Sequence, residues 1–224
     1  GELVITRSRL EQLSSEKEDL PLEETVEHLS RLTLDLRDQV LKTRMVPVEQ
    51  VFSRFPRLIR DLAKETGKEV DLEISGAETE LDRNVIDEIV DPLVHIIRNS
   101  VDHGIEEPEV REGNNKPRKG TVNLQAFQAG NSVVISISDD GKGIDAEAIK
   151  EKAIEKGLIT DEDALGLEKE EILGLIFAPG FSTAKKVTDV SGRGVGMDVV
   201  KTKITSLGGV VQISSTKGAG TTIT

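Results

Sequence analysis

The sequence predicts an α+β fold in which helices cover one face of a single sheet, preceded by a separate helical hairpin. Runs with apolar residues three and four apart alternate along the chain with short runs in which every second residue is apolar. The 224 residues suffice for one medium domain and an appendage, and no internal repeat is visible. Trp and Tyr are absent, so we expect a core of aliphatic residues and five Phe.

Residues 1–44 read as two helices, the first over about residues 2–16 and the second from Pro21, which suits a first helical turn. The second helix carries apolar residues at helical spacing from Val26 to Val40. A hairpin with one apolar stripe on each helix cannot bury both stripes alone. We therefore expect it to pair with a second copy in a four-helix bundle, the alternative being an arm packed on the following domain.

Residues 45–224 are predicted to form a second domain, which starts where Pro47 disfavours a continuous helix. Residues 113–120 read as a polar loop, and residues 157–193 are mostly loop. The predicted helices span residues 50–66, 83–103, 146–156 and 195–207, with a short helix at 169–177. The predicted strands span residues 69–75, 121–128, 132–138, 210–215 and 221–224.

The composition excludes several classes of function. Acidic residues outnumber Lys and Arg by 41 to 29, which argues against a nucleic-acid partner. Without cysteine there is no disulfide or thiolate metal site, in agreement with a cytoplasmic location. No apolar run approaches the roughly 18 residues of a membrane span, so direct membrane insertion is not expected. The start at Gly1 and the end in a strand-like run indicate an excised fragment whose C-terminal edge is truncated.

Polar residues share one face at the end of the predicted helix 83–103. His95 and Asn99 are four residues apart, and Asp102 and His103 extend the same face by a turn. The amide oxygen of Asn is a hard, neutral ligand suited to Mg²⁺, which keeps several waters and takes few protein groups. On its own, this pattern favours an ordinary polar helix face over a metal site.

A carboxylate and two glycines follow the predicted strand 132–138. Asp139 stands at the strand end, where it can accept a hydrogen bond from the amino group of adenine. Gly141 and Gly143 leave the backbone open, so that a purine can approach closely. The same residues could also form an ordinary turn between a strand and a helix.

A third glycine-rich segment, residues 192–198, leads directly into the predicted helix 195–207. Backbone amides at a helix N-terminus attract phosphate oxygens. The glycine spacing is that of a dinucleotide fingerprint, but a long loop rather than a strand precedes it, and no P-loop lysine is present. A Rossmann domain and a P-loop NTPase are therefore excluded.

Taken together, these motifs resemble the Bergerat-type ATPase fold, an α/β sandwich shared by gyrase, Hsp90, MutL and histidine kinases. The matching segments are an N box, a first glycine box, a Phe-containing lid, a second glycine box and a last Gly-x-Gly-Thr, here His95–Glu106, Asp139–Gly143, Leu175–Thr183, Gly192–Asp198 and Gly218–Thr221. The N box and the Ala-Pro-Gly-Phe-Ser-Thr of the lid resemble those of the chemotaxis histidine kinases. The resemblance spans residues 45–224, and residues 1–44 are similar to the dimerisation domain of that family.

The resemblance implies roles for individual residues. Asn99 would bind Mg²⁺ with His95 nearby through water, and these two residues are the catalytic candidates. Asp139 would bind the adenine amino group, while His103 and Lys152 would contact the phosphates or the ribose. The other residues implied in ATP binding are Asp102, Gly141, Gly143, Ile144, Gly194, Val195, Gly196, Met197 and Thr221, with Ser182 and Thr183 on the lid.

The residue four positions before the metal-binding Asn separates hydrolases from kinases. Gyrase, Hsp90 and MutL have a Glu there, which activates water, whereas this chain has His95. The resemblance therefore implies a protein-histidine kinase that binds Mg-ATP and phosphorylates a histidine on a separate phosphoacceptor domain. Its implied partners are a second copy of the chain, that acceptor domain and, through domains absent from this sequence, response regulators, an adaptor protein and chemoreceptors.

His28 on the second hairpin helix offers an alternative acceptor. Sensor kinases phosphorylate a bundle histidine that is followed directly by an acid and, six residues on, by a proline. Leu29 and Leu34 occupy these positions here, which argues against the alternative. A nucleotide-gated dimerisation module that only changes shape, and a slow hydrolase, also remain open at this point.

Overall fold

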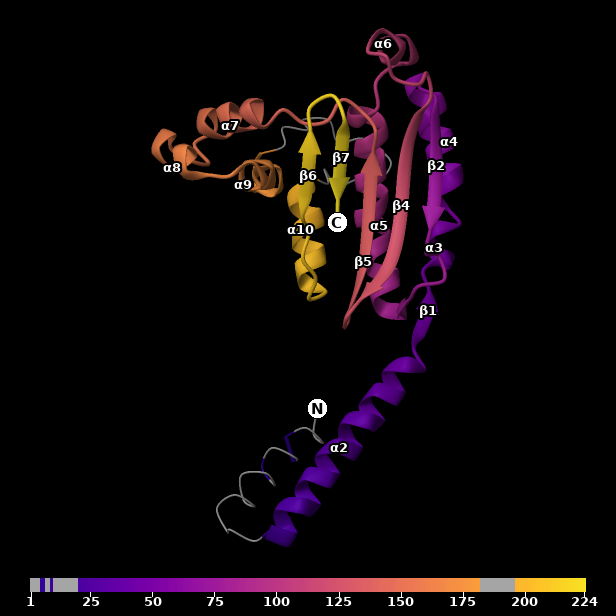
Figure 1. Cartoon of the computed structure of the whole chain (residues 1–224), viewed down its shortest axis with the longest axis vertical. Coiled ribbons are helices and arrows are strands. Elements are labelled where there is room, and N and C mark those ends of the chain that lie inside the picture. The colour runs from indigo at the N-terminus through magenta and orange to yellow at the C-terminus, as the bar shows by residue number, and fades with distance from the viewer. Residues whose placement is uncertain (1–4, 7–8, 10–19, 182–195) are drawn as a thin grey trace. The chain divides into compact units, whose positions relative to one another are not determined.

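The computed structural model describes residues 5–6, 9, 20–181 and 196–224 (Figure 1). The chain divides into two compact units, residues 1–46 and 47–224. In the first unit, helix α2 (Leu20–Lys42) confirms the predicted second helix, whereas most of the predicted first helix lies outside the described residues. The predicted domain limits at residues 44 and 45 remain a prediction.

Helix α2 leaves apolar side chains uncovered in a single copy of the chain. The side chains of Leu29, Leu32 and Leu36 are 43%, 51% and 57% exposed. Because exposed apolar surface of this kind is unfavourable in water, α2 presents a stripe that a partner can cover.

The second unit is built on a five-stranded mixed sheet. The spatial order is β2, β4, β5, β7, β6, with β2 and β4 parallel and the other pairs antiparallel. The strand bounds are β2 Val70–Ser75, β4 Gly120–Ala129, β5 Ser132–Asp139, β6 Ile213–Thr216 and β7 Gly220–Ile223. Two short strands, β1 (Met45–Pro47) and β3 (Glu80–Asp82), lie outside this sheet. The predicted strands are confirmed, although β6 begins three residues later than expected and β7 is shifted by one residue.

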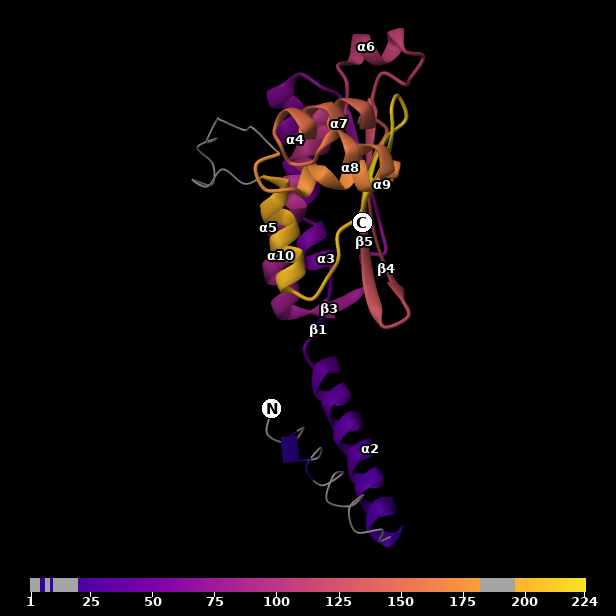
Figure 2. The ribbon, with the colours of Figure 1, turned by 90° about the vertical axis from the view of Figure 1, so that its left-hand side faces the viewer.

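Helices cover one face of the sheet, as predicted (Figure 2). They are α3 (Glu49–Phe52), α4 (Phe55–Thr66), α5 (Arg83–Asn99) and α10 (Met197–Ser206). The core is largely aliphatic, and its aromatic residues include Phe52 and Phe55, whose ring centroids are 6.1 Å apart. Its fully buried members include Ile97 of α5 and Val122 and Leu124 of β4.

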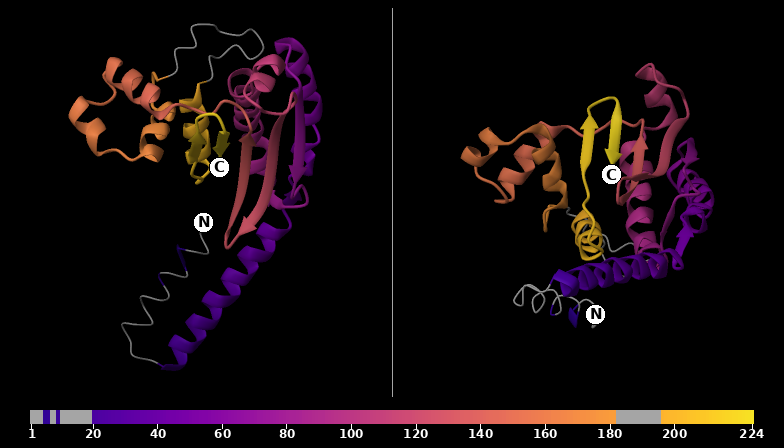
Figure 3. Two further views of the ribbon diagram at one scale, coloured as in Figure 1. Left: turned by 45° about the horizontal axis from the view of Figure 1, so that its top comes forward. Right: turned by 60° about the horizontal axis from the view of Figure 1, so that its bottom comes forward.

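A group of short helices lies beyond the β6 edge of the sheet (Figure 3). It contains α7 (Ala146–Glu155), α8 (Asp161–Gly166), α9 (Lys169–Gly174) and the 3₁₀ turn η2 (Leu175–Phe177). Helix α8 was not predicted, since the segment was read as loop. Its first turn is fixed by a capping box, in which Thr160 and Asp163 each bond the other's backbone amide.

Two predicted helices have different limits in the structure. The helix expected at 50–66 is divided into α3 and α4, because Pro56 has no amide hydrogen and suits the first turn of a new helix. The helix expected at 83–103 ends at Asn99, and residues Ser100–Gly104 form a π-helical turn, η1. Helix α6 (Pro108–Gly113), which begins at a proline, was not predicted.

We predict that residues 45–224 fold without the hairpin, since the buried apolar residues of the second unit come from its own elements. The truncated protein should unfold cooperatively and should bind an ATP analogue in a Mg²⁺-dependent manner. Calorimetry and titration would measure both. A truncated protein that is soluble and folded but fails to bind the analogue would contradict this prediction.

Candidate functional site

Three elements meet around the carboxylate of Asp139, the last residue of β5. This side chain is only 9% exposed, although it carries a charge when ionised. Its Oδ1 accepts a hydrogen bond from the backbone amide of Gly141 at 3.0 Å. The hydroxyl of Ser100 in η1 and the backbone amide of Thr221 in β7 also donate to it. The acceptor predicted at the strand end is therefore a buried carboxylate that receives hydrogen bonds from three donors.

The donors do not fully compensate for burial. Burial raises the pKa of Asp139, and the hydrogen bonds from Gly141, Ser100 and Thr221 oppose this rise without cancelling it. The neighbouring charge of Asp140 raises the pKa further. An ionised carboxylate in such a place still lacks part of the solvation that water would give. It is consequently a strong acceptor for a donor brought by a ligand.

Glycines allow the backbone to approach this carboxylate. A Cβ at Gly104 would lie 3.0 Å from the carboxylate atoms of Asp139, and a Cβ at Gly141 would lie 2.2 Å from the carbonyl oxygen of Gly104. Gly141 therefore has no room for a side chain, and a side chain at Gly104 would press on the carboxylate of Asp139. The close approach of the turn after β5 to the end of η1 depends on glycine at position 141.

The turn after β5 is also tied to the hairpin of β6 and β7. Gly143 has a φ of 65°, and a Cβ there would lie 2.1 Å from the carbonyl oxygen of Thr216. The amide of Ile144 donates to the hydroxyl of Ser215 at 2.8 Å, and this hydroxyl lies 2.9 Å from that of Thr221. Gly143, Ile144 and Thr221, three predicted site residues, are thus brought together.

Helix α5 is followed beside Asp139 by the π turn η1, and a lysine binds free carbonyl groups of this turn. The Nζ of Lys68 donates to the carbonyl oxygens of Val101 at 2.7 Å and Asp102 at 2.8 Å. Burial lowers the pKa of Lys68. Carbonyl groups at the end of a helix have no partner within it, so this contact fixes the wider turn. The turn places Ser100 next to the carboxylate.

The predicted metal ligand lies at the junction of α5 and α10. The Nδ2 of Asn99 donates to the sulfur of Met197 at 3.1 Å, and Asn99 is half-buried. This contact directs the amide nitrogen toward α10 and leaves the oxygen for another partner. His95, one turn earlier, is half-buried, and burial first and the charge of Arg98 second lower its pKa. The imidazole of His95 is therefore neutral near pH 7.

The remaining predicted site residues are placed less centrally or lie outside the described residues. His103 is exposed, and the carbonyl of half-buried Asp102 is bound by Lys68. The Nζ of Lys152 lies 5.2 Å from the ring centroid of Phe181, and among the described residues no hydrogen bond joins it to the Asp139 cluster. Gly196 caps α10. Four predicted residues fall outside the described ranges, namely Ser182, Thr183, Gly194 and Val195.

Sequence reasoning missed several residues that shape the site. Ser100 donates to Asp139, and Lys68 binds the turn at the end of α5. Arg111 and Lys116 bind the turn that follows Asp139. No element was predicted for residues 104–112, so Arg111 carried no signal for its ion pairs. Nothing in the local sequence pairs Lys68 with α5.

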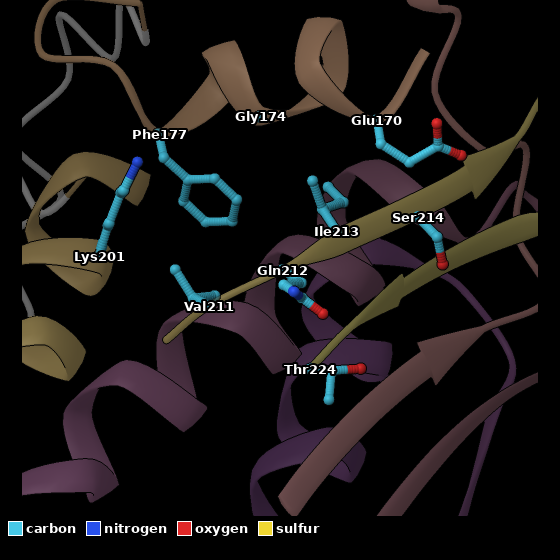
Figure 4. Close-up of a pocket in the computed structure, with 9 residues that line it drawn as sticks. All are labelled: Glu170, Gly174, Phe177, Lys201, Val211, Gln212, Ile213, Ser214 and Thr224. Carbon is cyan, nitrogen blue, oxygen red and sulfur yellow. The ribbon is translucent and has the colours of Figure 1, made fainter. Parts of the chain in front are cut away.

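A pocket opens elsewhere, between α9, α10 and β6 (Figure 4). Phe177, Val211 and Ile213 form its apolar side, and Glu170 and Lys201 stand at its rim. None of its lining residues belongs to the cluster around Asp139. This pocket is therefore separate from the predicted nucleotide site.

The sequence matches two family models. Residues 88–224 match the histidine kinase-, DNA gyrase B- and HSP90-like ATPase family, which is more than half of the chain. The chain belongs to this ATPase family. Residues 1–43 match the homodimeric domain of signal-transducing histidine kinases. The family implies that the chain binds ATP, and the second match, like the uncovered leucines of α2, supports a homodimer.

Individual relatives cover nearly the whole chain. Chemotaxis protein CheA of Bacillus subtilis is 58% identical over 219 residues, which are 98% of this chain and 33% of that protein. Sensor histidine kinase CheAY of Helicobacter pylori is 54% identical over 230 residues, 99% of this chain and 29% of that protein. CheA of Salmonella typhimurium is 50% identical over 226 residues, 100% of this chain and 33% of that protein. The chain thus spans about a third of the length of these relatives.

Within its described part, none of the helices has the length and apolar character that crossing a bilayer requires.

The adjacent carboxylates Asp139 and Asp140 should respond in opposite ways to neutralisation. Since the pKa of Asp139 is raised, the nucleotide-free protein loses stability as pH rises from the ordinary value of 3.8 to the raised one. Asp139→Asn should therefore raise the unfolding temperature at pH 7 and reduce the further rise caused by an ATP analogue.

Asp140→Asn serves as the matched variant, because the carboxylate of Asp140 lies 2.7 Å from the buried guanidinium of Arg111. We expect it to lower the free energy of unfolding by about 1–3 kcal/mol, the cost of an underpaired buried charge. Thermal scans of the three proteins test both signs. A lower unfolding temperature for Asp139→Asn would show that its donors already compensate for burial.

Proposed function

We propose that the chain binds Mg-ATP and transfers the γ-phosphate to a histidine on a separate phosphoacceptor domain, in chemotaxis two-component signalling in the cytoplasm. Identities of 50–58% to proteins named CheA, over almost the whole chain, support this proposal. The observation that carries it is the pairing of His95 with Asn99 on the ATPase fold. In the hydrolases of this fold, the position of His95 holds a water-activating Glu.

Asp139 selects the base. Its buried carboxylate accepts the hydrogen bond of the adenine amino group, which supplies solvation that the protein donors leave incomplete. A base without a donor at this position would leave the carboxylate buried and underpaired. Such an unmet acceptor typically costs about 1–3 kcal/mol, which favours adenine.

Asn99 holds Mg²⁺ through its amide oxygen. Its nitrogen is engaged by Met197, and within the described residues its oxygen accepts no hydrogen bond. One neutral protein oxygen suits Mg²⁺, which is usually bound by one or two protein groups together with water and phosphate oxygens. The ion would neutralise charge on the phosphates during transfer. His95 reaches the ion through water.

The N-terminus of α10 receives the phosphates. Its N-cap, Gly196, makes no side-chain cap bond, so the first amides of this ten-residue helix are available to an anion. Met197 follows as its first residue. His103 and Lys152 add positive or hydrogen-bonding groups toward the phosphates or the ribose. Gly194 and Val195, with Ser182 and Thr183 of the lid, complete the proposed site.

Transfer to a histidine requires little covalent chemistry from the protein. Phosphoryl transfer depends on positioning and charge neutralisation, and the attacking imidazole of the acceptor must be neutral. Burial lowers the pKa of His95, and a neutral imidazole in place of Glu gives no anionic base for water. The site consequently favours transfer over hydrolysis. Response regulators, an adaptor protein and chemoreceptors would act through parts of the protein outside this chain.

We predict that Asn99→Ala abolishes phosphotransfer while leaving the fold intact. Loss of one ligand of this kind typically costs roughly 3 kcal/mol of transition-state stabilisation, about a hundredfold in rate. Labelled ATP, Mg²⁺ and a phosphoacceptor domain from a CheA relative would measure the rate. Asn131→Ala, in the exposed turn between β4 and β5, should keep full activity. Full activity with unchanged Mg²⁺ dependence in Asn99→Ala would refute the assignment.

We also predict that the chain does not label itself. His95 and His103 belong to the proposed site, and exposed His28 lacks the following acid and proline of a sensor-kinase acceptor. With γ-labelled ATP, label should reach the added phosphoacceptor domain and not this chain. Free phosphate as the main product would instead favour a hydrolase, and neither product would favour a nucleotide-gated module. Acid-labile label on the chain that His28→Gln removes would make it a sensor-type kinase.

A further inference from the structure

Two cations, one buried and one partly exposed, bind the turn that follows Asp139. Arg111 lies in the last turn of the short helix α6, and Lys116 lies in the loop after it. Their side chains are 0% and 16% exposed. Together these two residues are named the cation clamp.

Every donor of Arg111 is engaged. A guanidinium has five N–H groups in a rigid fork. Nε donates to the carbonyl of Pro117 at 2.7 Å, Nη1 to Glu106 at 3.1 Å and to the carbonyl of Asp140 at 3.2 Å. Nη2 donates to the carboxylate of Asp140 at 2.7 Å and to the carbonyl of Lys119 at 3.4 Å. The orientation of Asp140 is thus fixed through both its side chain and its backbone.

Lys116 completes the clamp with three donors. Its Nζ lies 2.9 Å from Oε1 of Glu106, 2.9 Å from the carbonyl oxygen of Asp140 and 2.6 Å from that of Gly141. Burial alone would raise the pKa of Glu106, but the hydrogen bond from Lys116 and its neighbours bring it below the usual value. Glu106 therefore stays ionised and holds both cations in place.

The clamp orients two successive peptide planes. In a trans peptide the C=O and the following N–H point in opposite directions. Because the carbonyl of Asp140 faces the clamp, the amide of Gly141 points the other way, to the carboxylate of Asp139 at 3.0 Å. Because the carbonyl of Gly141 faces Lys116, the amide of Lys142 points to the carbonyl of Gly104 at 2.9 Å. The amide of Gly141 thus binds the Asp139 carboxylate, and the amide of Lys142 binds the backbone of Gly104, which packs on that carboxylate.

We propose that Arg111 and Lys116 are positioning residues for base recognition, which set the geometry of Asp139 by orienting the Asp140–Gly141 and Gly141–Lys142 peptides. The inference rests on the proposed role of Asp139 in binding the adenine amino group. Buried ion pairs often have little net effect on stability, so stability alone does not explain the clamp. A positioning role predicts that loss of the clamp weakens recognition of the adenine amino group more than binding of the rest of the nucleotide.

The test compares the affinity of the whole chain for ATP with that for purine riboside triphosphate, which lacks the 6-amino group. In the wild-type chain ATP should bind more tightly. Lys116→Met keeps the apolar stem and removes the three donors, and Arg111→Lys keeps the charge and removes the fork. Each should lower the ratio of the two affinities on the order of tenfold, the effect of one misplaced charged hydrogen bond. The affinity for purine riboside triphosphate should stay nearly constant.

Arg118→Met is the matched control, because Arg118 is a nearby cation whose bonds go to Glu69, Glu109 and Glu112 and not to the turn. It should keep the wild-type ratio. Equal weakening of both nucleotides, or an unchanged ratio in Lys116→Met, would overturn the inference, even if Arg111→Lys does not fold. Asp139→Ala distinguishes a failure of the proposed role of Asp139 from a failure of the inference about Arg111 and Lys116. If Asp139→Ala leaves the ratio of affinities unchanged, both fail. If it collapses the ratio while Lys116→Met does not, only the inference fails.

Discussion

The second unit depends on one unfavourable placement, an ionisable carboxylate buried at the end of a central strand. A buried charge is tolerated only where hydrogen-bond donors surround it. For Asp139 these donors come from η1, from the turn after β5 and from β7, which are far apart in sequence. Much of the local architecture serves to bring the three together. A ligand can supply the hydrogen bond that this carboxylate still lacks.

The glycines of the site follow from the same constraint. Donors from separate backbones can reach one carboxylate only if those backbones approach closely. Gly104 and Gly141 lie where a Cβ would collide with the carboxylate or with the facing carbonyl group. Gly220, with a φ of 126°, likewise approaches the backbone of Asp139 from β7. The glycine spacing of this chain is therefore explained by packing around a buried acceptor as well as by room for a nucleotide.

The sequence predicted what depends on local pattern. The strands, α7, α10 and the side of the sheet covered by helices follow from apolar spacing, and Asp139 follows from its place after a strand. The π turn was missed because it depends on Lys68, which is distant in sequence from the carbonyl groups it binds. Helix α6 was missed because its stability comes from tertiary ion pairs of Arg111 rather than from an apolar stripe. Long-range polar contacts leave no periodic signal in one sequence.

The chain belongs to an ATPase family, and burial of the Asp139 carboxylate is the physical basis that we propose for base recognition. The most direct measurement is the titration of the carboxyl carbon of Asp139 by ¹³C NMR in the nucleotide-free chain. Because burial outweighs the surrounding donors, the midpoint should lie above the ordinary aspartate value of 3.8. A midpoint at or below that value would show a fully solvated carboxylate and would contradict this basis for recognising adenine.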